Sequence, residues 1–141
     1  MKLGFRHISQ LREQPATAYL NEYLDADNEK NLVNAKYSYA IEIGGRLIAC
    51  AGVVEYWPGR GEAWAILDQN CKKEFLQLHG VVKRFLKVCP VRRIEAAVDT
   101  GFRAGHRWVR ALGFEMEAQR LKGYRPDGGD CSLYALIKEG I

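Results

Sequence analysis

The sequence has little cysteine and histidine, and their spacing excludes two common kinds of site. Only four cysteines and three histidines occur among the 141 residues. The cysteines form no CxxC pair and no histidine cluster stands beside them: Cys50, Cys71, Cys89 and Cys131. Zinc sites and disulfide frameworks both need cysteines at characteristic spacings. We therefore expect reduced thiols, as in a cytoplasmic protein, and no metal site.

Long apolar runs are also missing. The N-terminal stretch MKLGFRHISQ lacks the apolar core of a signal peptide. No window approaches the ~20 apolar residues that a membrane-spanning helix needs. Internal repeats and low-complexity tracts are absent too. We therefore expect a cytoplasmic protein with no membrane contact and with no boundary between domains.

A strong excess of one charge is likewise absent. The 21 basic and 17 acidic residues leave a formal net charge of +4. A dedicated nucleic-acid binder concentrates basic residues more strongly, so nucleic acid is not expected as a partner, while a phosphate-bearing ligand is compatible with this charge. With 48% hydrophobic residues, the chain can build one core, and we expect a single domain over residues 1–141.

In the first half of the chain, apolar and polar residues alternate as they do in strands. Apolar positions predict strands over residues 2–8, 36–43, 46–57 and 61–67, and two short helices within 9–27 that Pro15 divides. The Gly44-Gly45 pair is typical of a tight hairpin turn, and Pro58-Gly59 ends the long strand that follows it.

The second half alternates helix and strand. Helical spacing after Asp68 predicts the longest helix, which Pro90 closes, and a strand follows over residues 92–99. Because a helix separates this strand from 61–67, we expect the two strands to be parallel. A second amphipathic helix stops at Gly113. Residues 114–124 and 131–138 then form a hairpin around Pro-Asp-Gly.

This order of elements, with ALGF directly after an amphipathic helix and a closing hairpin, resembles the GNAT superfamily of acyl-CoA-dependent N-acyltransferases. More narrowly, the segments GEAWAIL, GHRWVRALGF and YRPDGGD are similar to those of the small GNAT-like proteins of tailed phages and prophages, which include an internal virion protein. The resemblance implies an α+β (α/β) fold. Its mixed, mostly antiparallel sheet would have six to seven strands and about four flanking helices.

The resemblance also implies acetyl-CoA as co-substrate and places its binding residues. The pantetheine arm would pair with the strand at Ile66 and Leu67. The pyrophosphate would sit on backbone N–H groups at the start of the next helix, where the helix dipole favours an anion. Five consecutive residues occupy that place: Gln69, Asn70, Cys71, Lys72 and Lys73.

At this loop the sequence departs from the family pattern. GNAT enzymes usually have glycines here, because glycine lets the backbone approach the phosphates. The stretch DQNCKKEF has none, and Asp68 adds a carboxylate. Lys72 and Lys73 either compensate as point charges or are two solvated lysines. Cys71 is either a thiol activated by the helix terminus or, as we expect, an ordinary cysteine.

A second departure lies on the following helix. Many GNAT enzymes carry there a tyrosine that protonates the departing thiolate, and the matching residue is Val109. His106 is the nearest titratable side chain, and because an imidazole suits acid–base work it is the candidate catalytic residue of this helix. By helical spacing it shares a face with Arg103 and Arg107, and we expect that face to be solvated. The alternative is that these three residues line the cofactor groove and meet CoA phosphates.

The family chemistry also needs a base for the attacking amine, usually a carboxylate on a central strand. Glu55 and Glu62 are the candidates, although each is equally compatible with a surface carboxylate at a strand end. Tyr56, Trp57 and Trp64 form either an aromatic surface for a ligand or, as is more common for strand aromatics, part of the core.

Two functions follow from these observations. The first is an N-acetyltransferase of phage or prophage type that transfers an acetyl group to a small-molecule or protein amine in the host cytoplasm. The second is a catalytically inactive GNAT-like phage protein that acts in virion assembly or modulates a host protein. The altered loop favours the second function, and the many enzymes of the superfamily favour the first.

Overall fold

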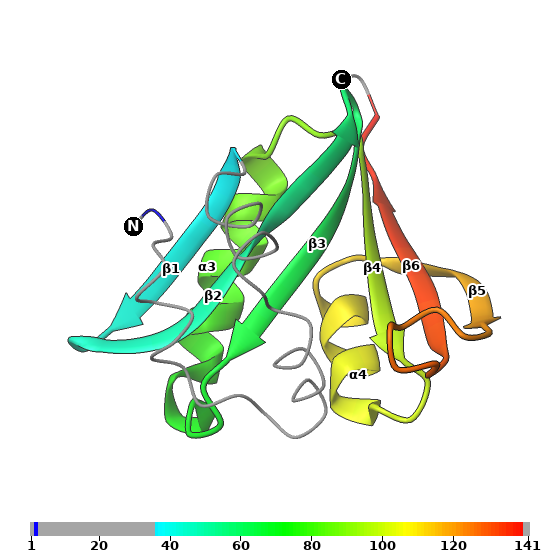
Figure 1. Cartoon of the computed structure of the whole chain (residues 1–141). Helices are drawn as coiled ribbons and strands as arrows, with labels where there is room; N and C mark the ends of the chain where they lie inside the picture. Colours follow the sequence, from blue (N-terminus) through cyan, green and yellow to red (C-terminus); the bar gives the residue numbers. More distant parts are fainter. Residues whose placement is uncertain (1, 3–35, 140–141) are drawn as a thin grey trace. The chain divides into compact units, whose positions relative to one another are not determined.

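The computed structural model describes Lys2 and residues 36–139 (Figure 1). Lys2 forms an isolated antiparallel bridge with Tyr39. The rest of the expected first strand, and the two short helices expected within residues 9–27, lie outside the described residues. All other expected elements fall within them.

Six strands and two α-helices make up the described chain (Figure 1). The strands are β1 (Tyr37–Ile43), β2 (Arg46–Trp57), β3 (Arg60–Leu67), β4 (Arg93–Asp99), β5 (Glu115–Leu121) and β6 (Cys131–Ile137). The helices are α3 (Phe75–Val88) and α4 (Arg103–Ala111), and the short 3-10 helix η2 (Lys72–Glu74) precedes α3. The mixed sheet is therefore confirmed with six strands. The prediction of about four helices is not supported, because residues 36–139 hold two.

The strands are joined in the order β1-β2-β3-β4-β6-β5. Strand β3 pairs with β4 in parallel, and the register covers Arg60–Glu62 against Arg93–Glu95. The pairs β1–β2, β4–β6 and β5–β6 are antiparallel. The parallel pair that the intervening helix predicted is thus confirmed, and most of the sheet is antiparallel.

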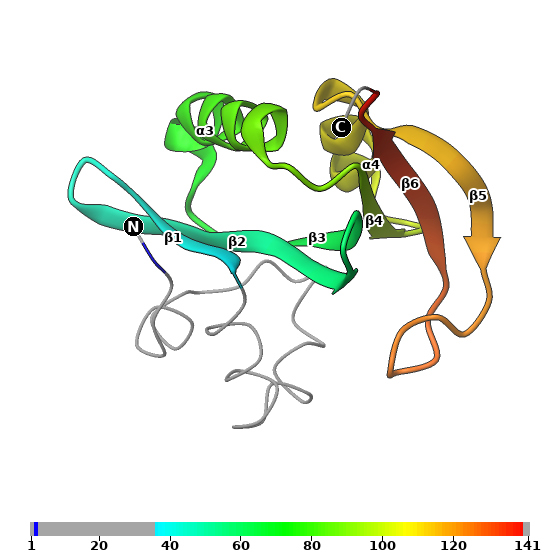
Figure 2. The same ribbon diagram turned by 90° about the horizontal axis from the view of Figure 1, so that it is seen from above.

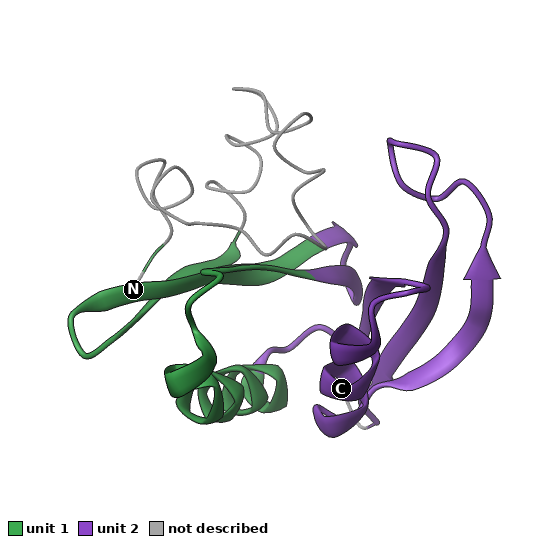
Figure 3. Ribbon diagram, turned by 90° about the horizontal axis from the view of Figure 1, so that it is seen from below, with its two compact units in different colours: residues 1–54, 64–88 green, residues 55–63, 89–141 purple. Residues whose placement is uncertain are grey.

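The chain divides into two compact units (Figure 3). Unit 1 contains residues 1–54 and 64–88, and unit 2 contains residues 55–63 and 89–141. The β2–β3 hairpin tip, with Pro58 and Gly59, therefore belongs to unit 2, while the other parts of these two strands belong to unit 1. The expectation of a single domain over residues 1–141 stays a prediction.

In unit 1, helix α3 covers one face of the first strands (Figure 2). The rings of Tyr37 and Tyr39 on β1 lie 6.3 and 5.3 Å from the ring of Phe85 on α3. Leu78 is fully buried on the same side of the helix. Gly44 and Gly45 have φ angles of 61° and 79°, which the tight turn between β1 and β2 requires. The alternating tyrosines thus face the helix, as the strand period indicates.

In unit 2, helix α4 lies close to β4. A side chain at Gly105 would come within 2.9 Å of Val98, so only glycine allows this approach. The helix stops where Gly113 takes a φ of 102°, the left-handed conformation that commonly ends helices. Ile94 and Tyr134 are fully buried in this unit. Within the part of the chain that the structure describes, neither helix has the length and apolar character that a membrane crossing requires.

Candidate functional site

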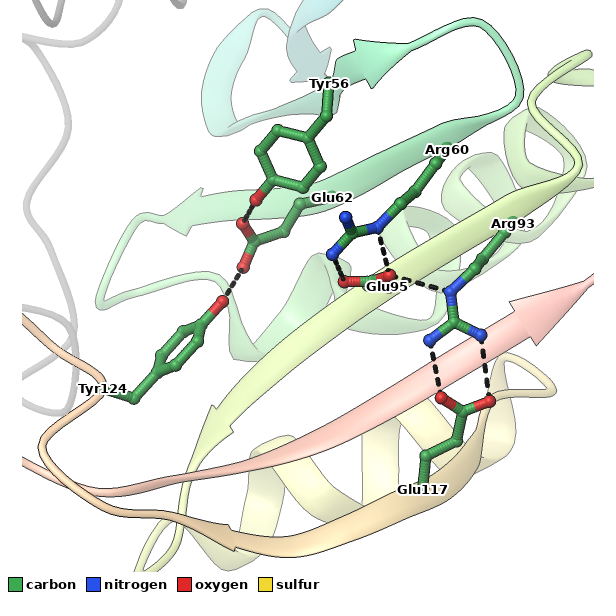
Figure 4. A network of polar contacts seen from close by, with 7 residues as sticks. All are labelled: Tyr56, Arg60, Glu62, Arg93, Glu95, Glu117 and Tyr124. Carbon is green, nitrogen blue, oxygen red and sulfur yellow. Dashed lines mark hydrogen bonds and ion pairs between the residues drawn. The ribbon is translucent and has the colours of Figure 1, made fainter.

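The carboxylate of Glu62 lies between two tyrosine hydroxyls in unit 2 (Figure 4). Tyr56 donates a hydrogen bond to Oε2, and Tyr124 donates to Oε1 at 3.3 Å. Both oxygens of the carboxylate therefore accept from neutral donors. Of the two carboxylates predicted as the base, Glu62 is the one that the structure places in a polar cluster. Glu55 is exposed near the end of β2.

Two different turns bring these three side chains together. Tyr56 and Glu62 face each other across the β2–β3 hairpin, which reverses at Pro58 and Gly59. Tyr124 comes from the loop between β5 and β6, 62 residues after Glu62. The hairpin pairing is readable from the sequence, whereas the contact with Tyr124 depends on the order of strands in the sheet.

The two phenols are held in their neutral form. Partial burial, together with the hydrogen bond to Glu62, raises the pKa of Tyr56 above its ordinary value. Partial burial and the nearby charge of Glu62 raise the pKa of Tyr124 to about 12. A carboxylate has about four lone-pair positions, so two remain for another donor after the two phenols bind. The arrangement can hold a cation, and it can take a proton from one.

A second carboxylate, Glu95, lies beside this cluster and is buried (Figure 4). The Arg60 guanidinium binds it through two nitrogens, with Nε at 2.6 Å from Oε2 and Nη2 at 3.0 Å from Oε1. Nε of Arg93 donates to the same Oε2 at 2.7 Å. The hydrogen bonds from Arg60 lower the pKa of Glu95, so this carboxylate stays ionised despite its burial.

Arg93 continues the network to the next strand. Its Nη1 and Nη2 atoms donate to the two oxygens of Glu117 on β5 at 3.0 and 2.5 Å. These bonds and those to Glu95 raise the pKa of Arg93. Such two-nitrogen pairs are the strongest ion pairs that side chains form. The network therefore ties β3, β4 and β5 together through charge.

Arg60 also lies against two exposed aromatic rings. Its Cζ atom is 5.0 Å from the ring centre of Tyr56 and 4.7 Å from that of Trp57. The side chains of Tyr56 and Trp57 are 46% and 56% exposed. The expectation that strand aromatics belong to the core is therefore wrong for these two residues. Trp64 is half-buried.

His106 does not lie on a solvated face. Its Nε2 atom is 3.1 Å from the carbonyl oxygen of Thr100, which can only accept, and Nδ1 is 2.7 Å from the hydroxyl of the buried Tyr134. In the neutral ring, Nε2 thus donates and Nδ1 accepts. Arg103 and Arg107 on the same helix are exposed. The solvated-face expectation is correct for the two arginines and wrong for the histidine, whose partners lie outside the helix.

The predicted pyrophosphate loop lies in unit 1, where Arg46 closes it. The guanidinium of Arg46 binds the carboxylate of Asp68, the backbone oxygen of Asn70 at 2.9 Å and the carboxylate of Glu74 at 2.8 Å. The side chain of Asp68 is only 6% exposed. The backbone N–H groups of Cys71 and Glu74 bond the carbonyl oxygens of Asp68 and Cys71. The loop is thus held by Arg46 of β2 and by hydrogen bonds between its own backbone groups.

These contacts test whether the loop fits the pyrophosphate of CoA. An anion cradle needs free backbone N–H groups and a close approach. Here two N–H groups are occupied, no glycine is present, and two carboxylates face Arg46. The loop therefore lacks the glycine cradle of the family pattern, and the Cys71 N–H group is not free to bind a phosphate. It offers two exposed ammonium groups instead, those of Lys72 and Lys73.

The remaining predicted residues of unit 1 lie in this loop or in the strand before it. The side chains of Ile66 and Leu67 are buried at the end of β3, and Gln69 and Asn70 are exposed. Cys71 is buried, and burial raises the pKa of its thiol. The interpretation of Cys71 as an activated thiol is therefore wrong, and the ordinary cysteine is confirmed. Among the described residues, no group of His, Cys, Asp and Glu side chains is arranged to hold a metal ion.

The residues that organise the Glu62–Glu95 cluster and the loop before α3 were not predicted from the sequence. Five were not singled out: Arg46, Arg60, Arg93, Glu95 and Tyr124. One signal was available, because RGEAWAIL and RRIEAAVD both place an arginine two residues before a glutamate on strands predicted to be parallel. The partners of Arg46 carried no comparable pattern.

Comparison with known proteins identifies solved structures with a similar fold. No protein-family model and no curated protein matches this chain. Among solved structures, Ard1 from Thermoplasma volcanium aligns with a TM-score of 0.78 and 16% identity, over 97% of this chain and 95% of that one. The GNAT-family acetyltransferase from Bacillus anthracis gives 0.68 and 18%, over 96% and 92%.

A third structure shows a member of this group with a bound ligand. RimL, a ribosomal L7/L12 alpha-N-protein acetyltransferase in complex with coenzyme A, aligns with a TM-score of 0.65 and 16% identity, over 85% of this chain and 77% of that one. The identities are low, so these likenesses concern architecture. This chain has the fold of the GNAT-family acetyltransferases.

Proposed function

We propose that this chain is an N-acetyltransferase that moves an acetyl group from acetyl-CoA to an amine. The fold supports the reaction class, since RimL, which shares it, is an alpha-N-protein acetyltransferase. The observation that carries the proposal is the Glu62 carboxylate between Tyr56 and Tyr124. The phage or prophage origin and the host cytoplasm, or the virion, as its location rest on the sequence resemblance.

Glu62 would act on the acceptor amine. The amine arrives as an ammonium ion at neutral pH, and the two free lone-pair positions of Glu62 can accept its N–H groups. The carboxylate then takes one proton, directly or through a water molecule, and leaves the nitrogen lone pair free to attack the thioester carbonyl carbon. As the C–N bond forms, the C–S bond would break, and the departing thiolate would take up the second proton that the nitrogen loses. The hydroxyls of Tyr56 and Tyr124 keep the carboxylate oriented during this step.

The donor side would use charge in place of a backbone cradle. Acetyl-CoA would supply the reactive thioester. Lys72 and Lys73 are the exposed cations of the loop that would attract its phosphates, and Arg103 and Arg107 are further exposed cations of unit 2. Ile66 and Leu67 would remain the strand positions for the pantetheine arm. Because these groups act as point charges, we expect weak and salt-sensitive donor binding.

The experiment combines calorimetric titration with acetyl-CoA and a transfer assay that follows thiol release over a panel of amines and amino-terminal peptides. Glu62→Gln should lower kcat by roughly a hundredfold or more, the usual contribution of a general base. Glu115→Gln, the same change at an exposed strand position, is the matched control. Glu55→Gln decides between the two carboxylates, and a larger loss there would assign the base to Glu55.

A second candidate function is favoured by the Arg46 contacts. A loop that Arg46 already closes over Asp68 and Glu74 needs no ligand to hold its shape. The chain would then be a catalytically inactive protein of this fold that acts in phage assembly or on a host protein. No heat with millimolar acetyl-CoA, together with no thiol release over the whole panel, would select this function over the enzyme.

A further inference from the structure

The β3–β4 pair places four charged residues in a regular array. In the parallel register, Arg60 lies opposite Arg93, and Glu62 lies opposite Glu95. Residues two apart on a strand point to the same face, so the two arginines and the two glutamates share one face of unit 2 (Figure 4). Like charges directly opposite each other on paired strands are destabilising. The array therefore needs an arrangement of contacts that separates them.

In the observed contacts, the two glutamates have different kinds of partner. Both guanidinium groups bind Glu95, Arg60 through two nitrogens and Arg93 through one. Glu62, on the same strand as Arg60 and two residues away, accepts hydrogen bonds from the phenols of Tyr56 and Tyr124. Glu95 is thus neutralised by two cations, whereas the partners of Glu62 carry no charge.

Burial explains why Glu95 attracts both arginines. Its side chain is 6% exposed, and a buried carboxylate needs paired charge much more than a half-exposed one does. The rings of Tyr56 and Trp57 lie along the Arg60 guanidinium and further fix it in this direction. Arg60 has the reach to bind Glu62, because side chains two apart on a strand start about 7 Å from each other.

We propose that Glu95 is a positioning residue that keeps the Arg60 guanidinium away from Glu62, so that the Glu62 carboxylate remains available to a cationic amine. Arg60 would otherwise occupy the same lone pairs as the substrate ammonium ion. This inference rests on the proposed function in one respect, the identity of the cation. The pairing of both arginines with Glu95, which leaves Glu62 with neutral partners, depends only on the residues of unit 2.

The decisive variant is Glu95→Gln, which keeps the size of the side chain and removes its charge. Arg60 should then turn to Glu62, and kcat/KM for the amine should fall by up to about fivefold, the effect expected when an ordinary ion pair must break before the substrate binds. Most of the loss should appear in KM. The double variant Glu95→Gln, Arg60→Gln removes the competing cation and should recover most of kcat/KM.

The matched control is Glu117→Gln, which makes the same chemical change in the same network but on the Arg93 side. It should leave Arg60 in place and change kcat/KM less than twofold. A purely structural role of Glu95 predicts a different pattern, in which the double variant is as weak as the single one. That pattern would overturn the proposal.

A readout independent of activity keeps the test separate from the proposed function. The crystal structure of Glu95→Gln, or the NMR signal of the Arg60 Nε–H group, shows where the guanidinium lies. If no amine is acetylated but Arg60 moves to Glu62, the proposed function fails, while the inference that Glu95 keeps Arg60 away from Glu62 is supported. If Arg60 stays beside residue 95, the inference fails whatever the activity. Should Glu95→Gln not fold, Glu95→Asp, with a shorter carboxylate, is expected to give a smaller shift of Arg60.

Discussion

The ring of His106 on α4 and the hydroxyl of Tyr134 on β6 meet at 2.7 Å, and this contact joins a helix to the central strand of unit 2. Tyr134 is fully buried, so its hydroxyl depends on a partner inside the protein. His106 in turn is fixed by the carbonyl oxygen of Thr100, 3.1 Å from its other nitrogen. The pair therefore serves the packing of α4.

His106→Phe tests this assignment. The substitution keeps a ring but removes the hydrogen-bond partner of the buried Tyr134 hydroxyl, so we expect a loss of about 1–3 kcal/mol in the free energy of unfolding. Urea denaturation measures it. Arg107→Gln, on the exposed side of the same helix, should stay within about 0.5 kcal/mol. An equally small change for His106→Phe would show that Tyr134 finds another partner.

The phenols beside Glu62 predict a loss of stability at high pH. The pKa of Tyr124 is about 12 in the folded chain, against about 10 for an ordinary tyrosine. Since the folded state holds this proton more tightly, the stabilisation is complete below pH ~10 and disappears as the pH rises towards 12. Tyr124→Phe should flatten this part of the stability profile, measured by thermal denaturation at increasing pH. An unchanged slope would contradict the assignment.

Arg46 is predicted to stabilise the loop before α3. Replacing it in Arg46→Met removes the ion pairs with Asp68 and Glu74, and the buried Asp68 charge loses a cation. We expect a loss of about 1–3 kcal/mol in the free energy of unfolding. Adding Asp68→Asn to the variant removes that charge and should restore part of the stability. A further loss in the double variant would mean that Asp68 acts through other contacts.

Two glycines should respond in opposite ways to alanine. At Gly52 on β2, a Cβ atom would lie 2.0 Å from the carbonyl oxygen of Tyr37, so the backbone must move and we expect at least about 3 kcal/mol of destabilisation. At Gly80 on α3, a Cβ atom meets only the tip of Arg84 at 3.6 Å, so alanine should stabilise by about 0.5–1 kcal/mol. Chemical denaturation of both variants checks the contrast.

The sequence was sufficient for elements whose cause is local. The turn at Gly44-Gly45, the change of period after Asp68 and the helix stop at Gly113 each depend on a few neighbouring residues, and the structure has all three. The parallel β3–β4 pair followed from the helix between the strands. The two helices expected within residues 9–27 lie outside the described residues.

Contacts between distant residues could not be predicted in the same way. Arg60 is 35 residues from Glu95, and His106 is 28 residues from Tyr134. Strand alternation predicts that a charged residue is exposed to solvent unless its partner is known. Glu95 was therefore treated as an ordinary strand residue. The face of α4 was read from its own period, which says nothing of Thr100 and Tyr134. Glu62 was singled out as a candidate because carboxylates on central strands suit the chemistry, and its contacts with the two phenols were not predicted.

The burial of all four cysteines has a practical consequence. A maleimide or a disulfide reagent can reach these sulfur atoms only when the surrounding segment opens, so the labelling rate measures the frequency of opening. Cys50 and Cys71 lie in unit 1, and Cys89 and Cys131 lie in unit 2. Variants that keep one cysteine each would therefore report on the opening of the two units separately. The probes are natural residues, and they react with the reagent only when their segment opens.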